Sequence, residues 1–159
     1  YPPKGDELWC ELEGKRHGDY TRWHDTGKIA EHVAYRLGKQ AGPSAQWDSN
    51  GRLAEEGNYK GGKRQGRWKS YRDGHLYLEG DFKDDIQHGL FRNFAGNGVK
   101  QAEGQFKDGQ PCGVFQCWSW ETGDPTGCKP LEPNPDCTLT KTGAQCPPCT
   151  ATSDSKTKE

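Results

Sequence analysis

The chain has 159 residues, enough for one ordinary domain, but only 30% of them are hydrophobic and 22 are glycine. This composition excludes a thick globular core, so the six Trp, six Tyr and five Phe residues must supply most of the buried surface. The formal net charge of −1 excludes the basic excess typical of nucleic-acid binding, and no apolar run approaches the length of about 18 residues that a transmembrane helix needs.

Residues 1–11 are expected to form a lead-in that ends in a capping strand. The prolines after Tyr1 disfavour a helix at the start. The segment Leu8-Trp9-Cys10-Glu11-Leu12 stands before Gly18 as residues 33–35 stand before Gly42, so it is interpreted as the second half of an incomplete repeat.

Residues 12–127 are predicted to be an array of repeats. The pattern Gly, any residue, aromatic, Lys, turn, then Gly, any residue, aromatic is clearest in residues 57–68, 80–91 and 104–115. The glycine before the second aromatic recurs at steps of 24, 24, 23 and 24 residues, at Gly18, Gly42, Gly66, Gly89 and Gly113. A fixed period of this length is typical of stacked supersecondary units.

Each unit is interpreted as two short strands joined by a hairpin turn. The turn dipeptides are Thr26-Gly27, Asn50-Gly51, Asp73-Gly74 and Asn97-Gly98, in which both residues can take positive φ. No segment keeps the apolar period of a helix for three turns. The predicted fold class is therefore all-β: one elongated antiparallel sheet of tandem hairpins, followed by a disulfide-rich irregular cap.

Gly57, Gly80 and Gly104 fall inside the expected second strands, where glycine weakens a strand. Their recurrence predicts that an aromatic ring from the neighbouring strand lies over the bare backbone. Acidic residues recur beside them and are expected to pair across the sheet with basic ones; the acids are Glu55, Glu56, Glu79 and Glu103, and the bases are Arg67, Lys69 and Arg92.

The aromatic residues are interpreted mainly as the core, because no other apolar mass exists. Trp68 and Tyr71 are three residues apart, which leaves open whether a bulge realigns them or whether they face opposite sides of the sheet. If rings emerge on both faces, the exposed row becomes the best candidate for binding. The candidate binding residues are Trp23, Trp47, Trp68, Tyr71, Phe94, Trp118 and Trp120.

Residues 128–159 are expected to form a Cys/Pro-rich cap and a flexible tail. Six of the seven cysteines are expected to form structural disulfides without a chosen pairing, namely Cys112, Cys117, Cys128, Cys137, Cys146 and Cys149. Cys10 is buried and free, paired with the tail, or bonded to another chain. Together with the absence of methionine, this density of cysteine favours a secreted, periplasmic or cell-surface protein, although a trimmed sequence would also lack methionine.

Other groups give no sign of catalysis or metal binding. His17 and His88 occupy one repeat slot that elsewhere holds Ala41, Gln65 or Cys112, so this slot is interpreted as a turn position. The basic turn segments are interpreted as solvated rather than as an anion site; they are Lys15-Arg16-His17, Lys60, Lys63-Arg64 and Lys83. No nucleophile motif is present, and no cofactor is expected.

The repeat resembles the MORN repeat, and more closely its bacterial variant type, in which a Gly-x-Trp-x-x-Tyr strand, an Asn-Gly turn and a Glu-Gly-x-Tyr strand alternate. The resemblance covers about residues 12–123. It implies a row of β-hairpins and a role in binding or scaffolding rather than catalysis. Some bacterial members of the family are labelled antitoxins.

The functional expectation is a non-enzymatic, secreted β-repeat protein that acts in protein–protein binding, scaffolding or self-assembly. A first alternative is a glycan or cell-wall binding module that uses exposed rings such as Trp23 and Trp47. A second is an immunity or antitoxin protein with mostly reduced thiols. A protein partner, self-association or a glycan is expected, and a nucleic-acid partner or a transmembrane segment is not.

Overall fold

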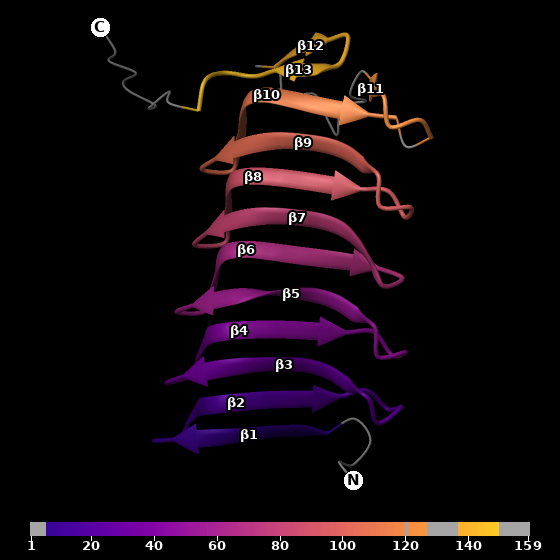
Figure 1. The fold of residues 1–159 in the computed structure, drawn as a ribbon. Coiled ribbons are helices and arrows are strands. Elements are labelled where there is room, and N and C mark those ends of the chain that lie inside the picture. The colour runs from indigo at the N-terminus through magenta and orange to yellow at the C-terminus, as the bar shows by residue number, and fades with distance from the viewer. Residues whose placement is uncertain (1–5, 120, 127–136, 150–159) are drawn as a thin grey trace, which may run out of the picture.

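The computed structural model describes residues 6–119, 121–126 and 137–149. They form one open sheet of 13 antiparallel strands, and this described part of the chain contains no helix. The strands follow one another in chain order from β1 to β10, and β13 and β12 continue the sheet beyond β10 (Figure 1). The predicted fold class is confirmed.

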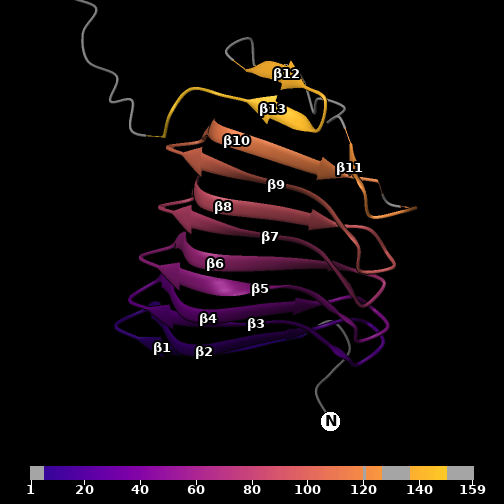
Figure 2. The ribbon, with the colours of Figure 1, turned by 45° about the horizontal axis from the view of Figure 1, so that its top comes forward.

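The sheet ends with β1 on one side and with the short strands β13 and β12 on the other, as a second view also shows (Figure 2). The array consists of β1 (Glu7–Leu12), β2 (Lys15–Trp23), β3 (Ile29–Arg36), β4 (Lys39–Trp47), β5 (Leu53–Lys60), β6 (Lys63–Arg72), β7 (His75–Lys83), β8 (Ile86–Phe94), β9 (Lys100–Lys107) and β10 (Gln110–Trp118). The short strands are β11 (Pro125–Thr126), which pairs with β10, and the hairpin of β12 (Thr138–Thr140) and β13 (Gly143–Gln145).

Tight two-residue turns join the strands at one side of the array (Figure 1). At the other side the strands are joined by longer loops, except for the tight turn Asp73-Gly74 between β6 and β7. The tight turns have positive φ at both residues, and these pairs are Glu13-Gly14, Leu37-Gly38, Gly61-Gly62, Asp84-Asp85 and Asp108-Gly109. The four turn dipeptides singled out in the sequence were expected to have positive φ at both residues, and this was wrong for three of them. Only Asp73-Gly74 has positive φ at both residues, whereas Thr26, Asn50 and Asn97 do not.

The three exceptions lie in longer loops that are closed by backbone hydrogen bonds. In the first loop the amide of His24 donates to the carbonyl of Lys28 (2.8 Å), and Gly27 donates to His24 (2.8 Å). Each loop therefore needs only one residue in the left-handed region, which the glycine supplies.

A transverse row of rings and small residues runs across the sheet and forms its core. Its cross-strand partners are Tyr20 with Val33, Val33 with Ser44, Ser44 with Gly57, Trp68 with Gly80, Gly80 with Phe91, and Phe91 with Gly104. Tyr20, Val33, Trp68 and Phe91 are buried, with 0–6% of their surface exposed. Trp68 on β6 and Phe91 on β8 thus each lie between glycines on the two odd-numbered strands beside them.

The predicted cover of the strand glycines is confirmed. A Cβ atom at Gly57, Gly80 or Gly104 would overlap the ring of Trp68, Phe91 or Phe115, respectively. The bare backbone is therefore the floor on which each ring lies.

A second row of rings closes the core on the same face. Tyr35, Tyr59, Phe82 and Phe106 each pair across the strands with a positive-φ repeat glycine. They meet the first row edge to face, with centroid distances of 4.9 Å for Tyr59–Trp68 and 5.1–5.5 Å for the contacts of Phe91 and Phe106 with their neighbours. Such pairs contribute about 0.5–1.5 kcal/mol each beyond the area that they bury.

The C-terminal cap extends the sheet and is tied to it by disulfides. Phe115 of β10 pairs with Ala144 of β13, so the cap is partly regular rather than wholly irregular. Cys112 in β10 bonds to Cys149, and Cys137 bonds to Cys146. Cys117 is also disulfide-bonded, and Cys10 is free and exposed. Cys128 and Trp120 lie outside the described residues.

Gly80→Ala is expected to lower the free energy of unfolding by about 1–3 kcal/mol, because the added methyl group must displace the ring of Phe91. Gly96→Ala is the matched control, since nothing lies within 4 Å of the added Cβ and φ at Gly96 is not positive. Urea unfolding of both variants measures the difference. Equal stability of the two would contradict the role assigned to the strand glycine.

Replacing Cys112 and Cys149 together by Ser is expected to lower the free energy of unfolding by about 2–4 kcal/mol, because the bridge closes a loop with a sequence separation of 37. Cys10→Ser is the control, since it removes a cysteine without removing a bridge within the chain. Thermal or urea unfolding under oxidising conditions makes the comparison. A double variant as stable as the control would show that the cap does not depend on this disulfide.

Candidate functional site

A third series of rings lies on the face opposite the two core rows. Trp23, Trp47, Tyr71, Phe94 and Trp118 each stand three residues after the core position of their own strand, and alternate residues of a strand face opposite sides. Tyr71 shows the result directly. Its hydroxyl donates a hydrogen bond to Glu56 (2.8 Å), and Glu56 also forms an ion pair with Lys69 (3.7 Å). Lys69 follows the buried Trp68 in the strand and therefore points to the face opposite the core.

The bulge that was considered as an alternative is also present, but on the partner strand. Between Ser70 and Tyr71 the register with β7 shifts, so that Ser70 pairs with Leu78 and Tyr71 with Leu76. Tyr77 is the extra residue, and Trp68 and Tyr71 remain on opposite faces of their own strand.

The candidate binding residues therefore separate into two groups. Trp68 is only 3% exposed and belongs to the core, so its assignment to a binding surface was wrong. Trp23, Trp47, Tyr71, Phe94 and Trp118 are half-buried, and they recur on every second strand. We call these five residues the outer row. Neighbouring members are about 9–10 Å apart, twice the separation of adjacent strands.

Charged residues alternate across the same face beside the outer row. Lys69 reaches Glu56 (3.7 Å), Arg67 reaches Glu79 (3.7 Å), and Arg92 bridges Glu79 (2.9 Å) and Glu103 (2.6 Å). The predicted pairing is confirmed for Glu56, Glu79 and Glu103, whereas Glu55 accepts a hydrogen bond from the hydroxyl of Ser70 (3.4 Å). Because the charges satisfy one another, they hold the side chains in place rather than presenting a field of one sign.

Two contacts connect the rings to this charge ladder. The ammonium of Lys100 lies 4.2 Å from the ring centroid of Trp118 and 3.2 Å from Glu103. Hydrogen bonding from Arg92 is the main reason why the pKa of Glu103 lies below its ordinary value. Burial, followed by the hydrogen bond to Glu56, raises the pKa of Tyr71 to about 12, so its hydroxyl stays protonated and available as a donor.

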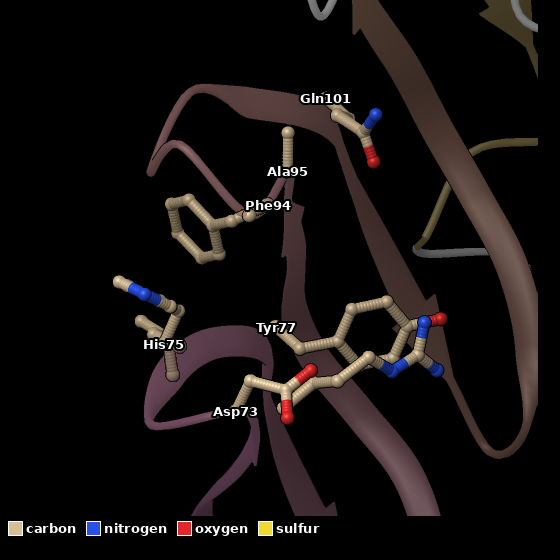
Figure 3. A pocket seen from close by; sticks show the side chains of 9 residues that line it. Asp73, His75, Tyr77, Phe94, Ala95 and Gln101 are labelled. Atoms are coloured by element: carbon tan, nitrogen blue, oxygen red, sulfur yellow. The ribbon is translucent and has the colours of Figure 1, made fainter.

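A hollow of about 370 Å³ opens beside the outer row at Phe94. Figure 3 shows Phe94, Tyr77 and His75 around it, with Ala95 and Gln101 toward the top of the view. Tyr77 is 37% exposed, and the guanidinium of Arg72 lies 4.2 Å from its ring centroid. Sequence reasoning missed Tyr77, because the equivalent bulge positions in other repeats are Ala30, Ala54 and Gln101.

A second hollow of similar volume lies where one repeat carries small residues. Its floor includes Pro43 and Ala45, at positions that hold Arg67 and Lys69 in the next repeat. Arg67, Lys69 and His32 also line it. The missing long side chains were visible in the sequence, but the space that they leave could be found only after the repeats had been aligned in the sheet.

Two of the basic turn residues, Arg16 and Arg64, lie over core rings. The guanidinium of Arg16 lies 4.7 Å from the ring centroid of Tyr20, and that of Arg64 lies 4.0 Å from Phe82, so both cover core rings. His17 and His88 lie within β2 and β8, so the interpretation of their slot as a turn position was wrong. His88 faces Asp108 at 3.5 Å. Within residues 6–119, 121–126 and 137–149, no group of His, Cys, Asp and Glu side chains could hold a metal ion.

The comparisons with known proteins identify the repeat itself. No curated protein matches the chain. The described residues contain no helix that is long and apolar enough to cross a membrane. Residues 16–36, which comprise most of β2, the following turn and β3, match the family described as the MORN repeat variant, and this match supports a MORN-type repeat.

Proposed function

We propose that this chain is a non-enzymatic binding protein that recognises its partner along the outer row. The observation that carries the proposal is the difference between the two aromatic series. Trp68, Phe91 and Phe115 are packed over glycine, whereas the outer row recurs in register on the opposite face, among paired charges. The outer row is not needed to form the core, so its rings are available for contact with a partner.

The surroundings of the outer row suit recognition of an extended partner. The ion pairs between Lys69, Arg92 and their acidic neighbours fix the flanking side chains, so little ordering is required when a partner binds. Half-exposed Trp and Tyr residues offer large contact areas with few rotatable bonds. The hollows beside Phe94 and over Ala45 provide space for side groups of the partner.

A linear glycan is the second candidate for the same surface. One ring on every second strand makes a ladder with a repeat of about 9–10 Å, on which successive sugar units of an extended chain can stack. The alternating charges offer hydrogen-bond donors and acceptors for hydroxyl groups. Binding to an array of insoluble and soluble polysaccharides separates this candidate from a protein partner.

An extracytoplasmic location is part of the proposal. The bridges Cys112–Cys149 and Cys137–Cys146 persist in oxidising compartments and are rare in the reducing cytosol. For this reason we favour a secreted or surface binding protein over an antitoxin with reduced thiols. Thiol counting by mass spectrometry of the native protein tests the location, and mostly free thiols would argue against it.

The Trp23→Ala/Trp47→Ala double variant is expected to weaken capture of the native partner by about tenfold or more, because truncation of aromatic anchors commonly costs 2 kcal/mol or above. The measurement is quantitative affinity capture from the native source, followed by titration with the identified partner. Leu37→Asn is the control, because Leu37 is an exposed apolar residue in a tight turn on the other side of the array, and Asn tolerates its positive φ. Equal binding by the double variant and the wild type would exclude the outer row as the binding surface.

A further inference from the structure

The two ends of the sheet differ in how they are finished. Beyond β10 the sheet is continued by β13 and β12 and tied by disulfides. At the other end β1 is the last strand, and nothing among the described residues pairs with its outer edge. All six residues of β1 are exposed. Such an edge presents unpaired backbone groups that another strand can bind.

The alternation of the backbone shows which groups are free. The carbonyl of Asp6 accepts a hydrogen bond from the amide of Trp23 (3.1 Å), so Asp6 faces β2. Because hydrogen-bonding direction alternates along an antiparallel strand, Leu8 and Cys10 also face β2, whereas Trp9 and Glu11 direct their amide and carbonyl groups outward.

The side chains of β1 repeat symmetrically about Cys10. Leu8, Cys10 and Leu12 lie on one face of the strand, and the two leucines are 65% and 47% exposed. Cys10 is exposed, and its thiol is free. An antiparallel strand of the same sequence, paired about Cys10, would therefore place leucine against leucine on both sides.

We propose that a second copy of this chain pairs with the outer edge of β1 about a two-fold axis at Cys10, and that the two Cys10 residues form a disulfide. Trp9 of each copy then lies opposite Glu11 of the other, and each of these pairs exchanges two backbone hydrogen bonds. Cys10 faces its own copy in a non-hydrogen-bonded pair, with a Cα separation of about 4.5 Å. That separation lies within the range that a disulfide spans.

The covalent bond compensates for the small size of this contact. Pairing of residues 8–12 alone buries less than the roughly 1,000 Å² expected of a stable interface. Acidic residues at the edge also oppose self-association, although Glu7 is neutralised by Arg16 (3.2 Å) and Glu11 accepts a hydrogen bond from Trp9 (2.9 Å). The edge thus aligns two chains transiently, added salt favours that alignment, and the disulfide retains it.

The oxidation proceeds by thiol–disulfide exchange with a small disulfide such as glutathione disulfide. The thiolate of one Cys10 attacks this disulfide and releases one glutathione thiolate, leaving a mixed disulfide. The thiolate of the second Cys10 then attacks the Cys10 sulfur of the mixed disulfide and releases the second glutathione thiolate. One disulfide is reduced, one is formed, and the two thiol protons pass to the released thiolates.

The experiment incubates the whole chain with glutathione disulfide and follows the peptide linked Cys10–Cys10 by mass spectrometry, with light scattering for the mass in solution. The wild type is expected to yield a disulfide-linked dimer, and yield it faster at higher ionic strength. Glu11→Pro is expected to slow linkage by about tenfold, because the variant loses one outward amide from each copy and so two hydrogen bonds of the pair. Proline at an edge position that faces solvent leaves the pairing of β1 with β2 intact.

Glu11→Gln is the matched control and is expected to link at least as fast as the wild type, because it keeps the amide and removes a charge. Far-UV circular dichroism verifies that all variants are folded. The proposal is overturned if the wild type stays monomeric with Cys10 held as a glutathione mixed disulfide. It is equally overturned if Glu11→Pro links as fast as Glu11→Gln, since that result indicates random collision of thiols. Neither outcome bears on the outer row, which lies on a face and not on this edge.

Discussion

The structure depends on a ring that lies over a strand glycine. In a sheet one layer thick no second layer exists to bury side chains, so burial must come from neighbours within the sheet. Trp68 is 3% exposed and Phe91 is 6% exposed because Gly57, Gly80 and Gly104 let each ring lie against the backbone. The cost of glycine in a strand is offset by the area that each ring buries.

This packing creates two faces with different properties. On one face, rings, glycines and the covering arginines Arg16 and Arg64 close on one another. On the other face, the three-residue spacing within each strand places the outer row among paired charges. The face that packs the core is thus separate from the face that carries the outer row.

The ends of the array follow from the same construction. A stack of hairpins leaves a strand with an unpaired edge at each end, because each repeat forms backbone hydrogen bonds only with the repeats beside it. The C-terminal end is completed by β13 and by the bond between Cys112 and Cys149. The other end carries the exposed strand β1, and no described residue pairs with its outer edge, toward which the backbone groups of Trp9 and Glu11 point.

The sequence by itself determined the repeat, the all-β class and the cover of glycine by rings, because these depend on local spacing and on the lack of any other apolar mass. It also indicated which acids and bases meet, since Glu79 and Arg92 recur at matching positions. Only the tertiary structure decided that Trp68 is core and Tyr71 is not, because the face of a ring depends on the register between strands. The tertiary structure also decided the tight turns at Leu37-Gly38 and Asp84-Asp85, because their φ values follow from strand twist rather than from a turn dipeptide. It decided the hollow over Ala45 as well, because this hollow exists only where neighbouring repeats lie side by side.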